Sequence, residues 1–187
     1  MLKLATILDE IRTKHRGATI EDIRNAFGDY HNVLRWLAAF LTGDDSLAQD
    51  CVVDACTIAE SQTSDFHEWL VHGGARATVR CTLQREHIKI AELAPKYEIG
   101  EPAPEHPPLP VKQFLWLINN AAEIHARLDV LCRSVLVLRG IAKDSYDEVA
   151  TQLGISRSAV EQAYSVAFDA LTMVAKLDLC SCGPADI

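Results

Sequence analysis

Residues 144–171, DSYDEVATQLGISRSAVEQAYSVAFDAL, constrain the fold more than any other stretch of the chain. They predict two short helices joined by a turn at Gly154, because glycine tolerates the left-handed backbone that often ends a helix. Ser156 follows at the position of an N-cap, where its hydroxyl can accept a hydrogen bond from the second helix. The apolar residues spaced to face inward are Val149, Leu153, Val160 and Ala163. This pattern predicts a helix-turn-helix.

In DNA-binding units of this layout, the second helix enters the major groove and its exposed early residues contact base edges. Residues 157–171 contain one base, Arg157, against the two acids Glu161 and Asp169. We therefore expect few phosphate contacts and a weak grip on DNA. The alternative interpretation is a plain helical hairpin that packs against its neighbours. The expected DNA-binding residues of this unit are Ser156, Arg157, Ser158, Glu161, Gln162 and Ser165.

Helical periodicity dominates the remainder of the chain, and no stretch alternates strictly as a half-buried strand would. The sequence therefore predicts an all-α fold. Residues 94–110, APKYEIGEPAPEHPPLP, are so rich in proline that we expect an extended, semi-stiff linker there. It would join two small helical domains, residues 1–93 and 111–187. Besides the opening motif, helices are expected near residues 2–14, 20–42, 46–61, 64–91, 111–126 and 128–139.

The composition is that of a globular protein with packed cores, since 49% of the 187 residues are hydrophobic. Apolar runs such as WLAAFL at 36–41 are far shorter than the roughly 20 residues that cross a bilayer. The first residues form an amphipathic pattern that contains acids, unlike a signal peptide. We therefore expect a cytoplasmic protein without membrane insertion.

Six cysteines are scattered along the chain, and without secretory features they are expected to be reduced. Cys180 and Cys182 form a C-x-C pair, which is a weak metal signal because further ligands at zinc-site spacing are missing. The sequence contains no P-loop, no nucleophile elbow and no recognisable pairing of Cys with His. We expect neither an enzyme, nor a metal site, nor a cofactor.

The net charge of −8 does not favour nucleic acid, but the charge is unevenly distributed. Residues 69–90 carry four bases against the single acid Glu86. Their spacing is roughly helical, so we expect one positive stripe that could bind nucleic acid. Gly73 and Gly74 precede it and predict a kink or a break in the helix. The four bases are Arg76, Arg80, Arg85 and Lys89.

Three ordered blocks, spanning about residues 21–175, resemble bacterial RNA polymerase sigma factors of the extracytoplasmic-function type. The first, residues 41–59, is similar to the block that ends one polymerase-binding helix and begins the next. The second, residues 65–86, resembles the tryptophan-led helix that recognises and melts the minus-ten promoter element. The third, residues 128–171, resembles the C-terminal domain that reads the minus-thirty-five element and contacts the polymerase flap.

The resemblance implies a transcription initiation factor with core RNA polymerase and promoter DNA as partners, and an anti-sigma factor as a further candidate. Asp50 and Asp54 stand where the family usually has acids, which implies polymerase binding, although Val53 replaces the usual glutamine. Arg76 and Arg80 replace the family's usual asparagine and aspartate.

Two other functions remain open on these residues. The acidic balance and the replaced motif residues would suit a sigma-like module that binds an anti-sigma-type regulator by mimicry and does not read DNA. A helix-turn-helix regulator that binds DNA without polymerase is the third candidate. Association with core polymerase distinguishes the initiation factor from the regulator that acts without polymerase. DNA affinity distinguishes the initiation factor from the module that binds an anti-sigma-type regulator.

Overall fold

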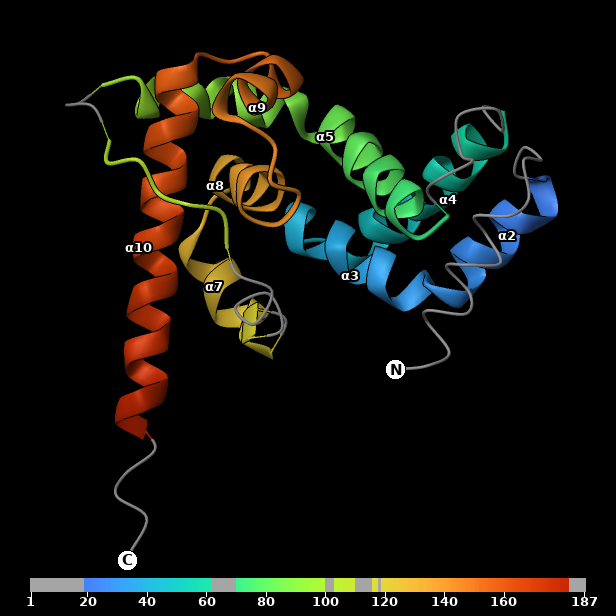
Figure 1. Ribbon diagram of the computed structural model, residues 1–187, viewed down its shortest axis with the longest axis horizontal. Coiled ribbons are helices and arrows are strands. Elements are labelled where there is room, and N and C mark those ends of the chain that lie inside the picture. The colour runs from blue at the N-terminus through green and yellow to red at the C-terminus, as the bar shows by residue number, and fades with distance from the viewer. Residues whose placement is uncertain (1–18, 62–69, 100–102, 110–115, 118, 182–187) are drawn as a thin grey trace, which may run out of the picture. The chain divides into compact units, whose positions relative to one another are not determined.

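A computed structural model describes residues 19–61, 70–99, 103–109, 116, 117 and 119–181 (Figure 1). Every regular element in this part of the chain is a helix, which confirms the all-α fold for the described residues. The elements are α2 (Ile20–Asp29), α3 (His31–Thr42), α4 (Asp45–Ser61), α5 (Leu70–Tyr97), α7 (Ala121–Arg127), α8 (Val130–Val135), η2 (Leu136–Ile141), α9 (Tyr146–Leu153) and α10 (Arg157–Ser181).

The backbone divides into two compact units, Met1–Thr82 and Leu83–Ile187. The chain passes from one unit to the other within α5, whereas the sequence placed the domain boundary in residues 94–110. The expected helix at 2–14 lies outside the described residues. No helix among the described residues is both long enough and apolar enough to span a bilayer.

In the first unit, the single helix expected at 20–42 is two helices. Tyr30 leaves the helical conformation with φ −104° and ψ 8°, and its N–H donates to Ala26 O. The preceding Gly28 and Asp29 are poor helix formers, so the break comes where propensity is weakest. Phe27 and Leu34, one on each side of the break, are both buried in the core.

Helix α4 packs along α3, and its start is capped by Asp44. Asp44 Oδ1 accepts the backbone N–H groups of Ser46 and Leu47 at 2.8 and 3.0 Å. Helix α4 thus begins one residue before the helix expected near 46–61, and Gly43 ends α3 with φ 77°. The core of this unit includes Ile23, Phe27, Leu34, Val52, Ala55, Ala59 and Cys81.

Helix α5 is longer and more continuous than expected. The sequence predicted a kink or break at Gly73 and Gly74, but α5 runs through both residues as one helix. Gly74 is buried, and a Cβ there would lie 3.6 Å from Leu34 and 3.7 Å from Phe27, so close packing compensates for the low helix propensity of glycine.

The expected extended linker is also wrong at its start, since α5 includes Pro95 and ends at Tyr97. Tyr97 is buried, and its Oη donates to Asp129 Oδ2 at 2.5 Å and accepts from Cys132 Sγ at 3.2 Å. These contacts hold the last turn of α5 in the second unit despite the hydrogen bond that Pro95 cannot make.

Asp129 links this contact to the start of α8, where its Oδ1 caps the N–H of Cys132 at 3.0 Å. Burial acts to raise the pKa of Asp129, but hydrogen bonds from Cys132 N–H, Tyr97 and Lys96 outweigh it and hold that pKa below its ordinary value. Burial also raises the pKa of Cys132 to about 12, so its thiol stays protonated near neutral pH. The contacts among Tyr97, Asp129 and Cys132 therefore join the end of α5 to the start of α8.

The second unit is built around α10, which packs against α7, α8, η2 and α9. The helix expected at 128–139 is α8 followed by η2, a π-helical stretch in which Ala142 N–H reaches Val137 O. Helices α9 and α10 are joined by the predicted turn, with Gly154 in the left-handed conformation at φ 66° and ψ 34°. The core includes Leu117, Ile124, Leu131, Val135, Val149, Val160, Ala163 and Tyr164.

Replacing Gly154 with Ala should lower the free energy of unfolding by about 1 kcal/mol, because an L-residue is strained at positive φ. Gly28→Ala is the matched control. A Cβ at either position meets no atom within 4 Å, but Gly28 lies in α2 and should gain stability with alanine. Urea denaturation of both variants measures the difference. Equal effects at the two positions would contradict the conformation assigned to the turn.

Candidate nucleic-acid interface

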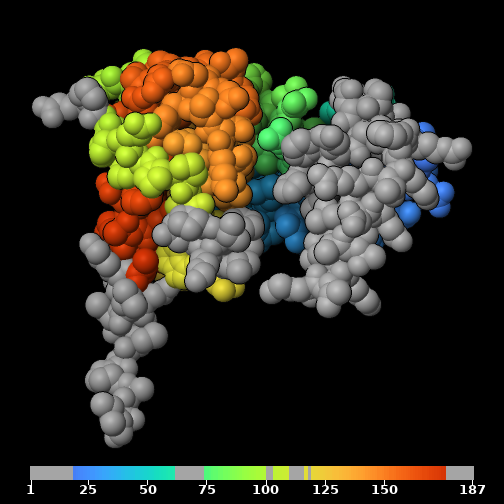
Figure 2. Space-filling view, in the orientation of Figure 1, coloured from blue at the N-terminus to red at the C-terminus, as the bar shows by residue number. Residues whose placement is uncertain are grey.

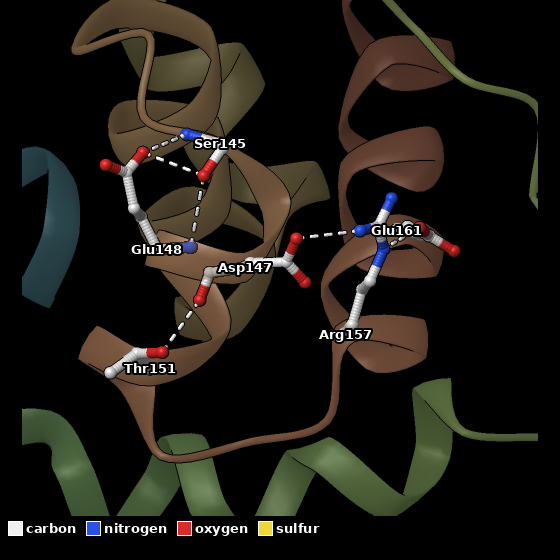
Figure 3. A network of polar contacts seen from close by, with 6 residues as sticks. All are labelled: Ser145, Asp147, Glu148, Thr151, Arg157 and Glu161. Atoms are coloured by element: carbon white, nitrogen blue, oxygen red, sulfur yellow. Dashed lines mark hydrogen bonds and ion pairs between the residues drawn. The ribbon is translucent and has the colours of Figure 1, made fainter.

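The start of α9 is fixed by a reciprocal cap, which Figure 3 shows. Ser145 Oγ accepts the N–H of Glu148 at 3.3 Å, and Glu148 Oε2 accepts the N–H of Ser145 at 2.7 Å. Two backbone donors that a helix start leaves unpaired are thereby satisfied. The cap sets where α9 begins and so positions Asp147, in its first turn, toward α10.

The predicted cap of α10 is confirmed. Ser156 Oγ accepts the N–H of Ala159 at 3.2 Å and lies 3.1 Å from Ser158 Oγ. The Ser156 hydroxyl therefore caps the start of α10. Ser158 is exposed on the first turn and remains accessible to a partner.

Arg157, the one base of the predicted recognition surface, is held by two carboxylates (Figure 3). Its Nε donates to Glu161 Oε1 at 2.7 Å, and a terminal nitrogen donates to Asp147 Oδ2 at 2.8 Å. The hydrogen bonds to Glu161 and then Asp147 raise the pKa of Arg157 above its ordinary value. The guanidinium is exposed but its charge is already balanced, so a phosphate would have to compete with both acids.

The other expected DNA-contacting residues of α10 are less accessible. Glu161 and Gln162 are half-buried, and Glu161 is committed to Arg157. Ser165 is also half-buried, with its Oγ 3.4 Å from Nε2 of His106 in the proline-rich segment. Within the predicted set, Arg157 and Ser158 are the exposed members.

A pocket of about 300 Å³ lies beside the first turn of α10 and includes residues that the sequence did not single out. Arg139 places its guanidinium carbon 4.7 Å from the ring centre of Tyr146 and 6.0 Å from that of Tyr164. Lys143 has φ 65°, which is unusual for a residue with a side chain. Both bases come shortly before the capping Ser145, which is the sequence signal that could have identified them. The lining is completed by Glu105, Ser145, Tyr146, Asp147, Glu148 and Arg157.

The bases of α5 are all exposed, but the expected single stripe is wrong. Five residues advance a regular helix by about 140° around its axis, so Arg80 and Arg85 do not share a face. Arg76 and Arg80 form one pair and Arg85 and Lys89 another. Lys89 Nζ also lies 2.8 Å from Oε2 of Glu86, whose residue is only 1% exposed. This ion pair partly neutralises the charge of Lys89.

The predicted polymerase-binding acids lie on α4. Asp50 is exposed and Asp54 is half-buried. Val53, three residues after Asp50 on the same helix, is an apolar side chain that is 54% exposed. Ile58 is also exposed, at 39%, but it follows Val53 by five residues and so lies on a different side of α4. A helix face that exposes an apolar residue beside acids is suited to a protein partner.

Among the described residues, no three His, Cys, Asp or Glu side chains gather as metal ligands would. Cys182 and Trp69 lie outside the described part of the chain. Comparison with protein-family models, with curated proteins and with solved structures finds no match to this chain.

The double variant Asp147→Asn, Glu161→Gln should bind mixed-sequence DNA about tenfold more tightly near 0.1 M salt. Arg157 would be free to make one phosphate contact, and each such contact contributes a slope of about −0.9 in log K against log salt. Glu123→Gln is the control, because it frees Arg127 from a similar exposed pair on α7. Fluorescence anisotropy with a labelled duplex gives the affinities. A gain that Glu123→Gln reproduces would remove Arg157 from the interface.

Proposed function

We propose that this chain is a sigma-like transcription initiation factor that binds core RNA polymerase and directs promoter recognition and melting. The observation that carries the proposal is the pair α9 and α10, both capped and joined at a left-handed glycine, with Arg157 and Ser158 exposed on the first turn of α10. In this role the pair is a helix-turn-helix that approaches upstream DNA. The three sequence blocks that resemble sigma factors support the same function.

The polymerase-binding surface is the face of α4 that carries Asp50, Val53 and Asp54. Its exposed apolar residue, Val53, would be covered by the polymerase, and the two acids beside it would orient the complex. The family's usual glutamine is replaced by Val53, which suits a more apolar contact.

Contact with the melted strand is assigned to Arg76 and Arg80, which are exposed on one face of the first unit's part of α5. Two guanidinium groups one helical turn apart can follow a phosphate backbone and stack on unpaired bases. Arg85 and Lys89 lie on another face of the helix and are not needed for this role.

The second candidate function is a sigma-like module that binds an anti-sigma-type regulator without reading DNA. It is favoured by one observation, the neutralisation of Arg157 by Asp147 and Glu161. A recognition helix whose one base within residues 157–171 is already paired offers little electrostatic attraction to DNA.

The proposal is tested by co-purification with bacterial core RNA polymerase. Val53→Asp should weaken the association by about 30-fold or more, because it would place a charge in the apolar part of the interface. Val33→Asp is the matched control: Val33 is also 54% exposed in the same unit, but it lies on α3. The control should bind as the unchanged protein does.

Absence of any association at low salt would contradict the initiation-factor function. Association that survives Val53→Asp would keep the function but remove the α4 face from the interface. Association with polymerase together with no DNA affinity of the complex would favour the mimicry function.

A further inference from the structure

The proline-rich segment 103–109 does not run free of the second unit but is docked on it. Figure 1 shows the segment passing beside α10, and Figure 2 shows its yellow-green atoms on the surface of α9 and α10. His106 stacks on Phe168 with ring centres 4.3 Å apart and 14° between the ring planes. Leu109 is buried, and its N–H donates to Gly140 O at 3.0 Å.

Two tyrosines hold the backbone of the segment. Tyr146 Oη donates to His106 O at 3.3 Å, and Tyr164 Oη donates to Pro107 O at 2.9 Å. Tyr164 also lies edge-on to the His106 ring, with the centres 6.4 Å apart. Extended proline-rich chains are in general bound in this way, on an aromatic surface whose side chains donate hydrogen bonds to the carbonyl groups of the chain.

The sequence of the segment favours this docking. Three of its seven residues are proline, so its backbone is restricted before it binds and little conformational entropy is lost on docking. It offers carbonyl acceptors but few N–H donors, and the N–H of Leu109 is satisfied by the carbonyl of Gly140 in η2. The Leu109 side chain also packs closely on Gly140: a Cβ added at Gly140 would lie 3.2 Å from Leu109 Cγ and Cδ1.

The docked segment occupies part of the surface that DNA would need. His106 lies against Ser165, which is on the predicted DNA-binding face of α10. Glu105 lines the same pocket as Arg139, Lys143 and Arg157 and so adds a carboxylate where a phosphate would approach. Both steric cover and charge therefore oppose DNA at this face.

We infer that residues 103–109 are an internal inhibitor of DNA binding: docked on α9 and α10 they cover the Ser165 side of the recognition helix, and DNA contact requires their release. The inference rests on the proposed function, because it assigns to α10 a contact with DNA. It adds a regulated step, in which the segment and DNA compete for one surface. If DNA binds only molecules in which the segment is released, its apparent affinity is lower than its intrinsic affinity, because only that fraction of molecules can bind it.

The test uses the full chain and two measurements on each variant. Hydrogen exchange of the Leu109 amide reports docking, and anisotropy of a labelled mixed-sequence DNA duplex in low salt reports affinity. His106→Ala removes the stack on Phe168 and leaves every expected DNA-contacting residue intact. It should speed the exchange of Leu109 and tighten DNA binding by about 3- to 10-fold, the range expected for loss of one aromatic stack.

His87→Ala is the matched control, since His87 is an exposed histidine of the same unit on α5. It should change neither the exchange of Leu109 nor the DNA affinity. The double variant Tyr146→Phe, Tyr164→Phe is the second route to release, because it deletes both hydroxyl donors and keeps both rings in the core. It should act in the same direction as His106→Ala. In the unchanged protein, saturating DNA should speed the exchange of Leu109.

Three results would overturn the inference. If Leu109 exchanges faster in His106→Ala but DNA affinity is unchanged and measurable, the segment does not cover the DNA site, and the proposed function is untouched. If Leu109 stays protected in both release variants, these contacts do not hold the segment. If neither the unchanged chain nor a released variant binds DNA, the DNA-reading part of the proposed function fails together with the inference.

Discussion

The arrangement of the C-terminal unit depends on the burial of Tyr164. Its ring is fully buried between Tyr146 and Phe168, and its hydroxyl still reaches a partner, Pro107 O, at 2.9 Å. A tyrosine buried in this way needs a hydrogen bond, because an unpaired hydroxyl in the core costs stability. The proline-rich segment supplies the acceptor, so the core of the unit and the position of the segment are coupled.

The same region explains why the chain is a poor candidate for strong, unassisted DNA binding. Arg157 is balanced by Asp147 and Glu161, and Arg139 faces the rings of Tyr146 and Tyr164. The two guanidinium groups beside the first turn of α10 are thus engaged within the unit. A factor of this kind would gain much of its DNA contact from assembly with a larger partner, because linked sites raise effective concentration. This is consistent with the proposed dependence on core polymerase.

Local rules were sufficient for much of the fold. The turn at Gly154, the cap at Ser156 and the helix near residues 46–61 each depend on a few neighbouring residues, and the sequence predicted them. The continuation of α5 through Gly74 and Pro95 and the docking of His106 depend on partners far along the chain. Leu34, Asp129 and Phe168 decide those features, and no local pattern connects them with their partners. The set expected at the DNA face did not include Arg139 and Lys143, because it was drawn from the second helix alone, although both bases come shortly before the capping Ser145.

The proposed role in initiation is tested by transcribing a library of DNA fragments with core RNA polymerase, with and without the chain, and sequencing the transcript 5′ ends. We expect start sites that appear only with the chain, share a common upstream sequence and diminish when Arg76 and Arg80 are both replaced by Ala. Identical start sites with and without the chain, under conditions in which it is bound to the polymerase, would show that it does not direct initiation.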